Sequence, residues 1–257
     1  MKACVIACFF GKNIENVFSA VKNHNAYFFT NNPEIKPMVE AKGWTYIFFD
    51  LPLSDDEAVS SFQAKYIKFL QFLKHYEYAS FKKYDVVIYV DHKLELKDSH
   101  IKQAISELGD YNLLMRTHHD SRKNIWEEVG MAMFQERYLR YMPQTIDWIR
   151  EKINDGYSDK PTVLSTGLIF YKHLNSNAIN FADNVYNALE KIGTSECQIV
   201  CAMLAQKHSD IIKIIHWNDL NIVWDIPKKK ERYFTPKTVL KLVIPFGLLE
   251  LWRVVKR

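Results

Sequence analysis

The stretch YDVVIYVDHKLELK, residues Tyr84 to Lys97, decides the fold class. Its five consecutive apolar residues, 86–90, are typical of a strand buried on both faces, as in a parallel sheet. Asp91, His92 and Lys93 follow at once, and an aspartate at the end of a buried strand is costly to desolvate unless it meets a cation or donors. We therefore expect a functional site at this strand end, although a solvated end with an Asp91–Lys93 neighbour pair would explain the same residues.

Short β-rich runs alternate with helical patterns on both sides of this strand. The expected strands are 5–10, 26–30, 45–49, 85–90, 112–115, 162–171 and 211–216. The expected helices are 13–22, 34–42, 55–78, 101–108, 122–141, 144–153, 180–192 and 196–206. This order predicts an α/β domain with an open, mostly parallel but mixed central sheet flanked by helices, and ligands in such sheets bind at the carboxyl ends of the strands. No GxGxxG or GxxxxGK[ST] motif follows the first strand, which argues against a classical dinucleotide fold and a P-loop.

Composition excludes several classes of function. The 257 residues are 48% hydrophobic and 25% charged, which suits one large globular domain. The net charge of +4 is mild, with no basic stripe of the kind that nucleic-acid binding needs, so no nucleic-acid partner is expected. The apolar N-terminal run lacks a cleavage site and is expected to be a first strand of a cytoplasmic protein.

The four cysteines form two C-x3-C pairs, Cys4 with Cys8 and Cys197 with Cys201. This spacing invites a zinc hypothesis, but structural zinc sites usually use C-x2-C. Each pair instead shares one face of an expected strand or helix. We expect four small buried thiols in a reducing compartment.

The last 22 residues differ from the rest of the chain. Residues 236–257 read PKTVLKLVIPFGLLELWRVVKR, in which Lys241, Pro245 and Glu250 interrupt an apolar run too short to span a bilayer. We expect a domain over residues 1–235 followed by a basic amphipathic tail. A helix on the inner, anionic surface of the cytoplasmic membrane and a helix docked on the domain are equally compatible with this pattern.

Several short motifs resemble, in consistent order, the glycosyltransferase-like domain described in plant turgor-regulation and seed-mucilage proteins and in bacterial relatives. IYVDHKLEL (88–96) resembles the family's Asp-Gly-Lys-Leu-x-Leu strand, and AKYIKFL (64–70) its preceding basic helix. MRTHHDSRKNIWEEV (115–129), STGLIFYKH (165–173) and SECQIVCAML (195–204) resemble three later motifs of that domain. The resemblance covers residues 1–217, with His92 standing where the family has Gly and Ser195 where it has Arg.

The resemblance implies a GT-A-like nucleotide-sugar glycosyltransferase. The expected donor is a nucleoside-diphosphate sugar, and the expected acceptor is a hydroxyl of a glycan or of a lipid-linked glycan. The bacterial members and the tail together suggest surface polysaccharide or lipopolysaccharide biosynthesis. The two departures from the family pattern leave open a catalytically silent scaffold or binding protein on the same fold.

Candidate donor-binding residues follow from the expected strand ends. They are Thr30, Asn31, Lys65, Asp91, His92, Lys93 and Gln198. Asn31 could hold a base or ribose, although Asn31-Asn32-Pro33 equally favours a turn. Lys65 could bind a diphosphate as a point charge, although lysines more often lie on a solvated helix face.

Candidate acceptor, catalytic and metal residues lie in the second half. His118, His119 and Arg122 are candidates for acceptor binding, and Asp120, Glu128 and Glu196 for the carboxylate base that an inverting enzyme needs. Asp120 could equally cap a helix, and Glu196 could be a first-turn acid. A divalent cation, Mn²⁺ or Mg²⁺, would be held by Asp91 and His216, unless lysines neutralise the diphosphate directly. A zinc hydrolase built on His118, His119, Asp120 and His216 is the remaining alternative.

Overall fold

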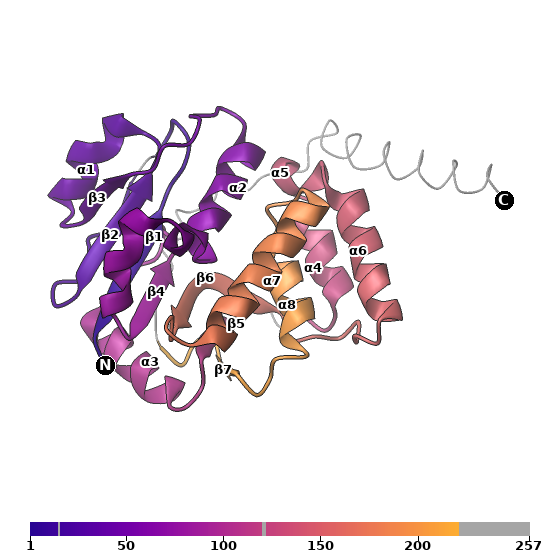
Figure 1. Ribbon diagram of the computed structural model, residues 1–257. Coiled ribbons are helices and arrows are strands. Elements are labelled where there is room, and N and C mark those ends of the chain that lie inside the picture. The colour runs from indigo at the N-terminus through magenta and orange to yellow at the C-terminus, as the bar shows by residue number, and fades with distance from the viewer. Residues whose placement is uncertain (15, 120–121, 221–257) are drawn as a thin grey trace. The chain divides into compact units, whose positions relative to one another are not determined.

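The computed structural model describes residues 1–14, 16–119 and 122–220, and within them seven strands form one mixed sheet (Figure 1). The sheet order is β3-β2-β1-β4-β6-β5-β7. The strands are β1 Ala3–Cys8, β2 Asn25–Thr30, β3 Thr45–Phe48, β4 Val86–Val90, β5 Leu113–Thr117, β6 Leu164–Tyr171 and β7 Ile212–Ile215. Only β6 runs antiparallel to its neighbours, β4 and β5. The mostly parallel, mixed sheet is therefore confirmed, and it is consistent with a GT-A-like fold.

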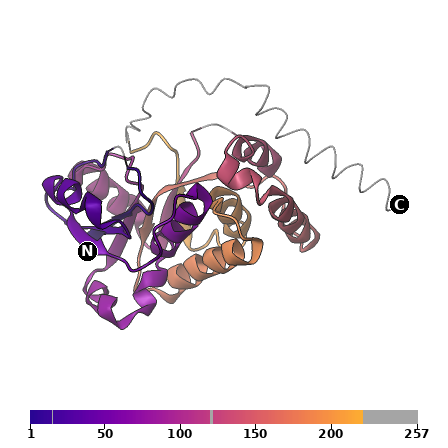
Figure 2. The ribbon, with the colours of Figure 1, turned by 90° about the horizontal axis from the view of Figure 1, so that it is seen from above.

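Helices cover both faces of the sheet (Figures 1 and 2). They are α1 Lys36–Ala41, α2 Glu57–Lys68, α3 Asp98–Leu108, α4 Ile125–Ala132, α5 Glu136–Leu139, α6 Met142–Asn154, α7 Ser176–Ile192 and α8 Cys197–Ala205. Three 3₁₀ segments, η1 Pro33–Ile35, η2 Gln71–Lys74 and η3 Tyr76–Lys83, complete the list for the described residues. Alternate residues of β1 and β4 pack with α1 and α3 in one core cluster, while α2 packs on β1 and α8 on β6. Each strand of the centre is thus buried on both faces, as its continuous apolar sequence predicts.

The prediction of a helix at 13–22 is wrong, because the described residues of this segment form no helix. Their backbone groups bond elsewhere: the Ala20 amide donates to the Lys42 carbonyl (2.8 Å), and the Phe18 carbonyl accepts from the Trp44 indole (2.7 Å). The Asn16 side chain accepts from the Val17 amide at 2.9 Å, a local bond that competes with helix formation. Val17 is nevertheless fully buried, so its apolar spacing reflects packing rather than a helix.

Two other expected helices are shorter than their apolar periodicity suggested. The expected helix 55–78 ends at Lys68, because Leu70 adopts a left-handed conformation (φ 58°) and η2 and η3 follow. The expected helix 122–141 divides into α4 and α5, and α4 begins only after Asn124, whose side chain accepts from the Glu127 amide. Asn124 is therefore the cap of α4; the alternative cap, Asp120, lies outside the described residues.

All four cysteines are buried free thiols, as expected. No helix within the described residues has the length and apolar character needed to cross a membrane. The expected tail, residues 236–257, lies outside the described residues.

Candidate functional site

Asp91 directly follows β4, at the edge of the sheet where the parallel strands have their carboxyl ends. Its amide donates to the Gly167 carbonyl of β6 (2.8 Å), which fixes the backbone. Its Oδ1 accepts from the Tyr89 hydroxyl at 2.6 Å and lies 3.2 Å from the Lys68 ammonium. Because both contacts use Oδ1, the second oxygen is the one that a ligand could take.

Helix α2 supplies two lysines to this strand end. Asp56 caps the helix by accepting from the Ala58 amide at 2.8 Å. Lys65 and Lys68 are three residues apart and therefore share one face, which the helix turns toward the sheet. Their exposed fractions are 6% and 3%, so the alternative of a solvated helix face is wrong. The Lys68 ammonium also lies 4.8 Å from the centre of the Tyr89 ring, in a cation–π contact.

The pKa values in this cluster follow from burial and neighbouring charges. Burial raises the pKa of Asp91, but Lys68, the Tyr89 hydroxyl and Lys65 outweigh it and hold that pKa at about 2. Burial lowers the pKa of Lys68, yet the charge and hydrogen bond of Asp91 together with its other acidic neighbours outweigh burial, so the net shift is upward. Lys65 differs: burial dominates, and its pKa is lowered. Asp91 is therefore a carboxylate and Lys68 an ammonium at neutral pH.

The start of α8 and helix α5 complete the cluster from the far end of the sequence. Glu196 is 2% exposed and caps α8, its Oε1 accepting from the Gln198 amide at 2.9 Å. Burial raises the pKa of Glu196, while Gln198, Lys65 and Arg137 oppose that shift. Glu196 therefore lies close to Lys65 and Arg137, and α5, which carries Arg137, contacts α2 (Figure 1).

Three members of the cluster were missed by sequence reasoning: Tyr89, Arg137 and Tyr138. In the sequence Tyr89 is one of five apolar strand residues, but its hydroxyl contacts both Asp91 and, at 3.8 Å, the Cys8 thiol. Arg137 packs on the Tyr138 ring, 4.6 Å from its centre. Burial raises the pKa of Tyr138 well above its usual value, with the Glu196 charge adding to this effect. Alternation along β4 could have revealed Tyr89, because Tyr89 and Asp91 share one face; no pattern pointed to α5.

His92 and Lys93 follow Asp91 in a tight turn closed by the Leu94 amide, which donates to the Asp91 carbonyl at 2.9 Å. The His92 ring packs edge-on against Phe9, with ring centres 5.2 Å apart. Burial lowers the pKa of His92 to about 4, despite the opposing effect of Asp91. His92 is therefore a neutral side chain at pH 7, whereas Lys93 is exposed to solvent.

Thr30, Asn31 and Asn32 lie at the carboxyl end of β2 and are all buried. The Asn31 amide group donates to the Pro52 carbonyl (3.0 Å), and its Oδ1 accepts from the Gly11 amide (3.1 Å). Asn32 bonds to Gly11 and caps the 3₁₀ helix η1. These bonds tie together the loops after β1 and β3, which is the turn-forming role that the Asn-Asn-Pro sequence offered as an alternative.

Within the described part of the chain, the remaining candidate residues do not form one cluster. His118 and His119 follow β5, with ring centres 4.2 Å apart. Glu128 on α4 is buried and forms an ion pair with Arg122. Asp120 lies outside the described residues. Gln198 is half-buried, and its amide is used in the cap of α8.

Asp91 and His216 follow strands that are not neighbours in the sheet. β7 lies three strand positions from β4, which is about 14 Å at the usual spacing between strands. His216 is exposed, and its ring accepts from the Asn218 amide. Among the described residues, no three His, Cys, Asp or Glu side chains are arranged to hold a metal ion.

The donor set around Asp91 also fits a divalent cation poorly. Mn²⁺ and Mg²⁺ prefer several oxygen ligands, usually including more than one carboxylate. Here Asp91 has one oxygen engaged by Lys68 and Tyr89, and the charges of Lys65 and Lys68 act on it directly. The nearby carboxylate, Glu196, is used as a helix cap. The residues around Asp91 therefore do not form a suitable site for a divalent cation.

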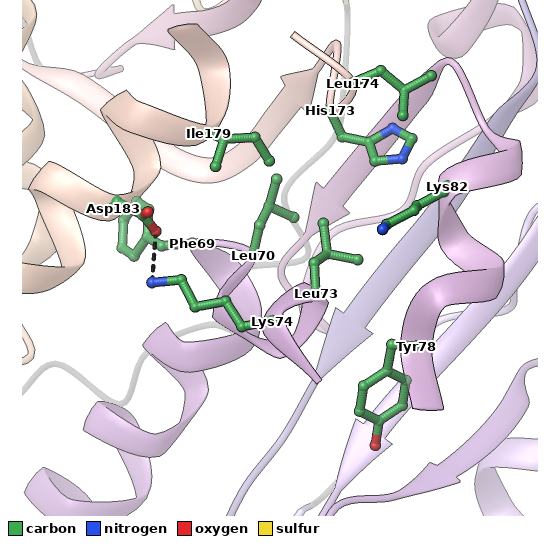
Figure 3. Close-up of a pocket in the computed structure, with 10 residues that line it drawn as sticks. All are labelled: Phe69, Leu70, Leu73, Lys74, Tyr78, Lys82, His173, Leu174, Ile179 and Asp183. Atoms are coloured by element: carbon green, nitrogen blue, oxygen red, sulfur yellow. Dashed lines mark ion pairs between the residues drawn. The ribbon is translucent and has the colours of Figure 1, made fainter. Parts of the chain in front are cut away.

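A separate apolar pocket of about 260 Å³ lies away from this site (Figure 3). Leu70 and Ile179 line it, and the Lys74–Asp183 ion pair (3.1 Å) closes one side. His173, also in its lining, follows the carboxyl end of β6. Because β6 is antiparallel to β4, this pocket belongs to the edge of the sheet opposite Asp91.

Comparisons with known proteins give only distant likenesses. Neither a protein-family model nor a curated protein matches the sequence. The crystal structure of a glycosyltransferase involved in the glycosylation of the major capsid of PBCV-1 is 10% identical, with a TM-score of 0.42 over 84% of this chain and 82% of that one. The crystal structure of mouse xyloside xylosyltransferase 1, in its apo form, is also 10% identical, with a TM-score of 0.41 over 84% and 85% of the two chains. Likenesses at this level assign no activity to this chain.

Proposed function

We propose that this chain is a glycosyltransferase that binds a nucleoside-diphosphate sugar at the strand end around Asp91. The single observation that carries the proposal is the cluster of half-buried Asp91 with the buried Lys68 and Lys65 at the carboxyl edge of a mostly parallel sheet. Ligands of such sheets bind at this edge, and buried ionic clusters that stability alone does not require are concentrated at functional sites. The resemblance of IYVDHKLEL to a glycosyltransferase-like strand supports the same conclusion.

In the proposed reaction, an acceptor hydroxyl attacks the anomeric carbon of the sugar. The bond between that carbon and the diphosphate oxygen breaks, and the diphosphate leaves with the electron pair. Cations beside the leaving group stabilise the charge that develops on it. Lys65, Lys68 and Arg137 are the cations of this cluster, and Asp91 holds Lys68 in position.

The proton of the acceptor hydroxyl needs a base if the enzyme inverts the anomeric centre. Of the described carboxylates, Glu196 fits this role better than Glu128. Its pKa is raised by burial, which brings it nearer to neutral pH, and it lies beside Lys65. Glu128 is instead engaged by Arg122.

The acceptor is proposed to be a glycan or a lipid-linked glycan in bacterial surface polysaccharide or lipopolysaccharide biosynthesis. Two observations support this choice: the bacterial members of the family that the motifs resemble, and the basic, apolar sequence of residues 236–257. A cytoplasmic enzyme at the inner membrane surface would meet such an acceptor where it is assembled.

The first experiment measures thermal unfolding with UDP, GDP, CDP and their sugars, each with Mn²⁺ and with EDTA, followed by product analysis for the nucleotide that stabilises. A rise in Tm of several degrees with one nucleotide, lost in Asp91→Asn but kept in the exposed control Asp210→Asn, supports the donor site. Release of the free nucleoside diphosphate from the nucleotide sugar then establishes transfer or hydrolysis. If no nucleotide shifts the Tm at millimolar concentration, the proposal is wrong.

A catalytically silent binding protein is the second candidate, and one observation favours it. Both described candidates for the base are buried and already bonded, Glu128 to Arg122 and Glu196 to the start of α8. A nucleotide that raises the Tm without any turnover of its sugar, with glycan or lipid-linked acceptors present, would select this candidate.

A further inference from the structure

Within the described part of the chain, Lys65 is a charged residue of this cluster that has no ion-pair or hydrogen-bond partner for its ammonium group. Its exposed fraction is 6%, and no hydrogen bond or ion pair joins its ammonium group to another described residue. Lys68, one helical turn away and equally buried, has Asp91. A buried ammonium without a counterion is costly, so such a residue is retained where a ligand completes it.

The charges around Lys65 do not cancel within the described residues. Lys65, Lys68 and Arg137 contribute three cations, whereas Asp91 and Glu196 contribute two carboxylates. Each carboxylate already has a partner: Lys68 and Tyr89 contact Oδ1 of Asp91, and the start of α8 bonds to Oε1 of Glu196. One more basic than acidic side chain therefore lies at this strand end, an arrangement that suits an anion from outside.

The ammonium of Lys65 is also within reach of the surface. Nε of Arg137 is completely enclosed and has no hydrogen-bond partner. Nζ of Lys65 also lacks a partner, but it is not completely enclosed. The nearby Asp91 side chain is 32% exposed, which shows that the cluster opens to solvent there. An incoming anion can contact Lys65 without unfolding the site.

We propose that Lys65 binds a phosphate group of the donor directly and that the site binds diphosphates without a divalent cation. In this arrangement Asp91 is the internal counterion of Lys68 rather than a metal ligand. Lysine binds phosphate as a compact point charge and needs no bidentate geometry, which suits a single ammonium at the end of a buried stem. The inference rests on the proposed function because it concerns the same site, but it does not require that sugar be transferred.

The test titrates inorganic pyrophosphate into the full-length protein by calorimetry, once with EDTA and once with Mn²⁺. The proposal expects the dissociation constant in EDTA to be within about threefold of that with Mn²⁺. Lys65→Met, which keeps the length of the side chain and removes its charge, should weaken binding at least tenfold. Lys102→Met removes the same charge from an exposed position on α3 and should change the constant less than twofold.

Thermal unfolding of the unliganded variants separates a ligand-binding lysine from a structural one. Because Lys65→Met removes an uncompensated buried charge, its Tm should equal or exceed that of the parent protein. If this variant does not fold, Arg137→Met in the half-buried α5 provides the second test and should also weaken pyrophosphate binding at least tenfold.

Three results would overturn the inference: binding that disappears in EDTA, unchanged binding by Lys65→Met, or no pyrophosphate binding at millimolar concentration. Sugar transfer that requires Mn²⁺ would overturn it and leave the proposed function standing. Metal-free pyrophosphate binding that depends on Lys65, without turnover of any nucleotide sugar, would support it and remove the proposed function.

Discussion

Lys68 and Asp91 form an ion pair in which the lysine side chain is 4% exposed and the aspartate side chain 32%. The cation is therefore enclosed between α2 and the sheet, while the carboxylate keeps one side open to solvent. The Tyr89 hydroxyl donates to the same carboxylate oxygen at 2.6 Å, so the orientation of Asp91 is fixed from two directions. This arrangement explains why an acid follows a buried strand: the charge of Asp91 neutralises the charge of a lysine that the fold has buried.

Lys68→Met should lower the free energy of unfolding by about 3 kcal/mol at pH 7, because it leaves Asp91 partly buried without its cation. It should also raise the pKa of Asp91, which is now held at about 2. The stabilisation by Asp91 is complete above its unfolded pKa of about 4 and is lost as the pH falls through the folded value. In the variant this acid loss should be smaller and should be complete at a higher pH, because the folded pKa lies closer to the unfolded one.

Urea unfolding at several pH values checks both expectations, with Lys102→Met as the control for a change of net charge. The double variant Lys68→Met/Asp91→Asn should recover part of the loss, because it removes both charges. A Lys68→Met protein within about 0.5 kcal/mol of the parent would mean that the ion pair does not contribute to stability.

Asn31→Ala should destabilise the protein by about 2–3 kcal/mol. The change leaves the buried Gly11 amide without its acceptor, whereas the exposed Pro52 carbonyl keeps the Gln63 side chain as a donor. Asn13→Ala, in an exposed position of the neighbouring loop, should have little effect on stability. Chemical denaturation measures both; an Asn31→Ala protein of unchanged stability that loses nucleotide binding would instead make Asn31 a direct ligand.

The central sheet could be predicted from the sequence because its strands are continuous apolar runs ended by polar residues. Val86 to Val90 is the clearest case, and its buried neighbours on both sides confirm the interpretation. Asp91 could be found for the same reason. These features are local, since they depend only on which residues follow one another.

The composition of the cluster could not be predicted, because it depends on contacts between distant segments. Glu196 is more than one hundred residues from Asp91, and Arg137 comes from a four-residue helix inside a region expected to be one long helix. The error at 13–22 has a related cause: Val17 and Val21 have helical spacing, but the backbone between them bonds to residues after α1. Tertiary hydrogen bonds there outweigh a weak helical pattern.

Gly11→Ala should cost more stability than Gly156→Ala, although both glycines have positive φ. Gly11 has φ +114°, and a Cβ there would lie 3.0 Å from Oγ of Ser60 on α2; Gly156 has φ +86° and nothing within 4 Å of such a Cβ. Backbone strain costs about 1–2 kcal/mol at each position, and the contact with Ser60 adds about 1 kcal/mol at Gly11 alone. Unfolding of the two variants measures the difference, and equal losses would show that the close approach to α2 has no energetic effect.

His92→Gln should change how stability depends on pH in the acid range. The folded pKa of His92 is about 4, below the unfolded value of about 6.5, so the unfolded chain binds the extra proton between them. Stability from neutral His92 is therefore present above about pH 6.5 and decreases, by about 2–3 kcal/mol, as the pH falls to 4. The variant should lack this part of the decrease.

The measurement is the free energy of unfolding at intervals from pH 7 to pH 4, combined with the NMR titration of the His92 ring. A His92 ring that titrates near pH 6.5 would contradict the burial that lowers its pKa.

The ion pair between Arg122 and Glu128 separates a structural from a catalytic role for Glu128. Both side chains are almost completely enclosed, with exposed fractions of 9% and 4%. Arg122→Met should cost about 3 kcal/mol, because it removes the cation that pairs with the buried Glu128 carboxylate. Glu128→Gln should also destabilise the protein, because it removes the carboxylate from this ion pair. The double variant Arg122→Met/Glu128→Leu should recover most of that loss, since apolar residues can replace a buried pair. Denaturation measures the stabilities of the three variants, and a sugar-transfer assay measures their activities. If the pair is structural, the double variant should recover activity together with stability. If Glu128 is catalytic, the double variant should be stable but inactive.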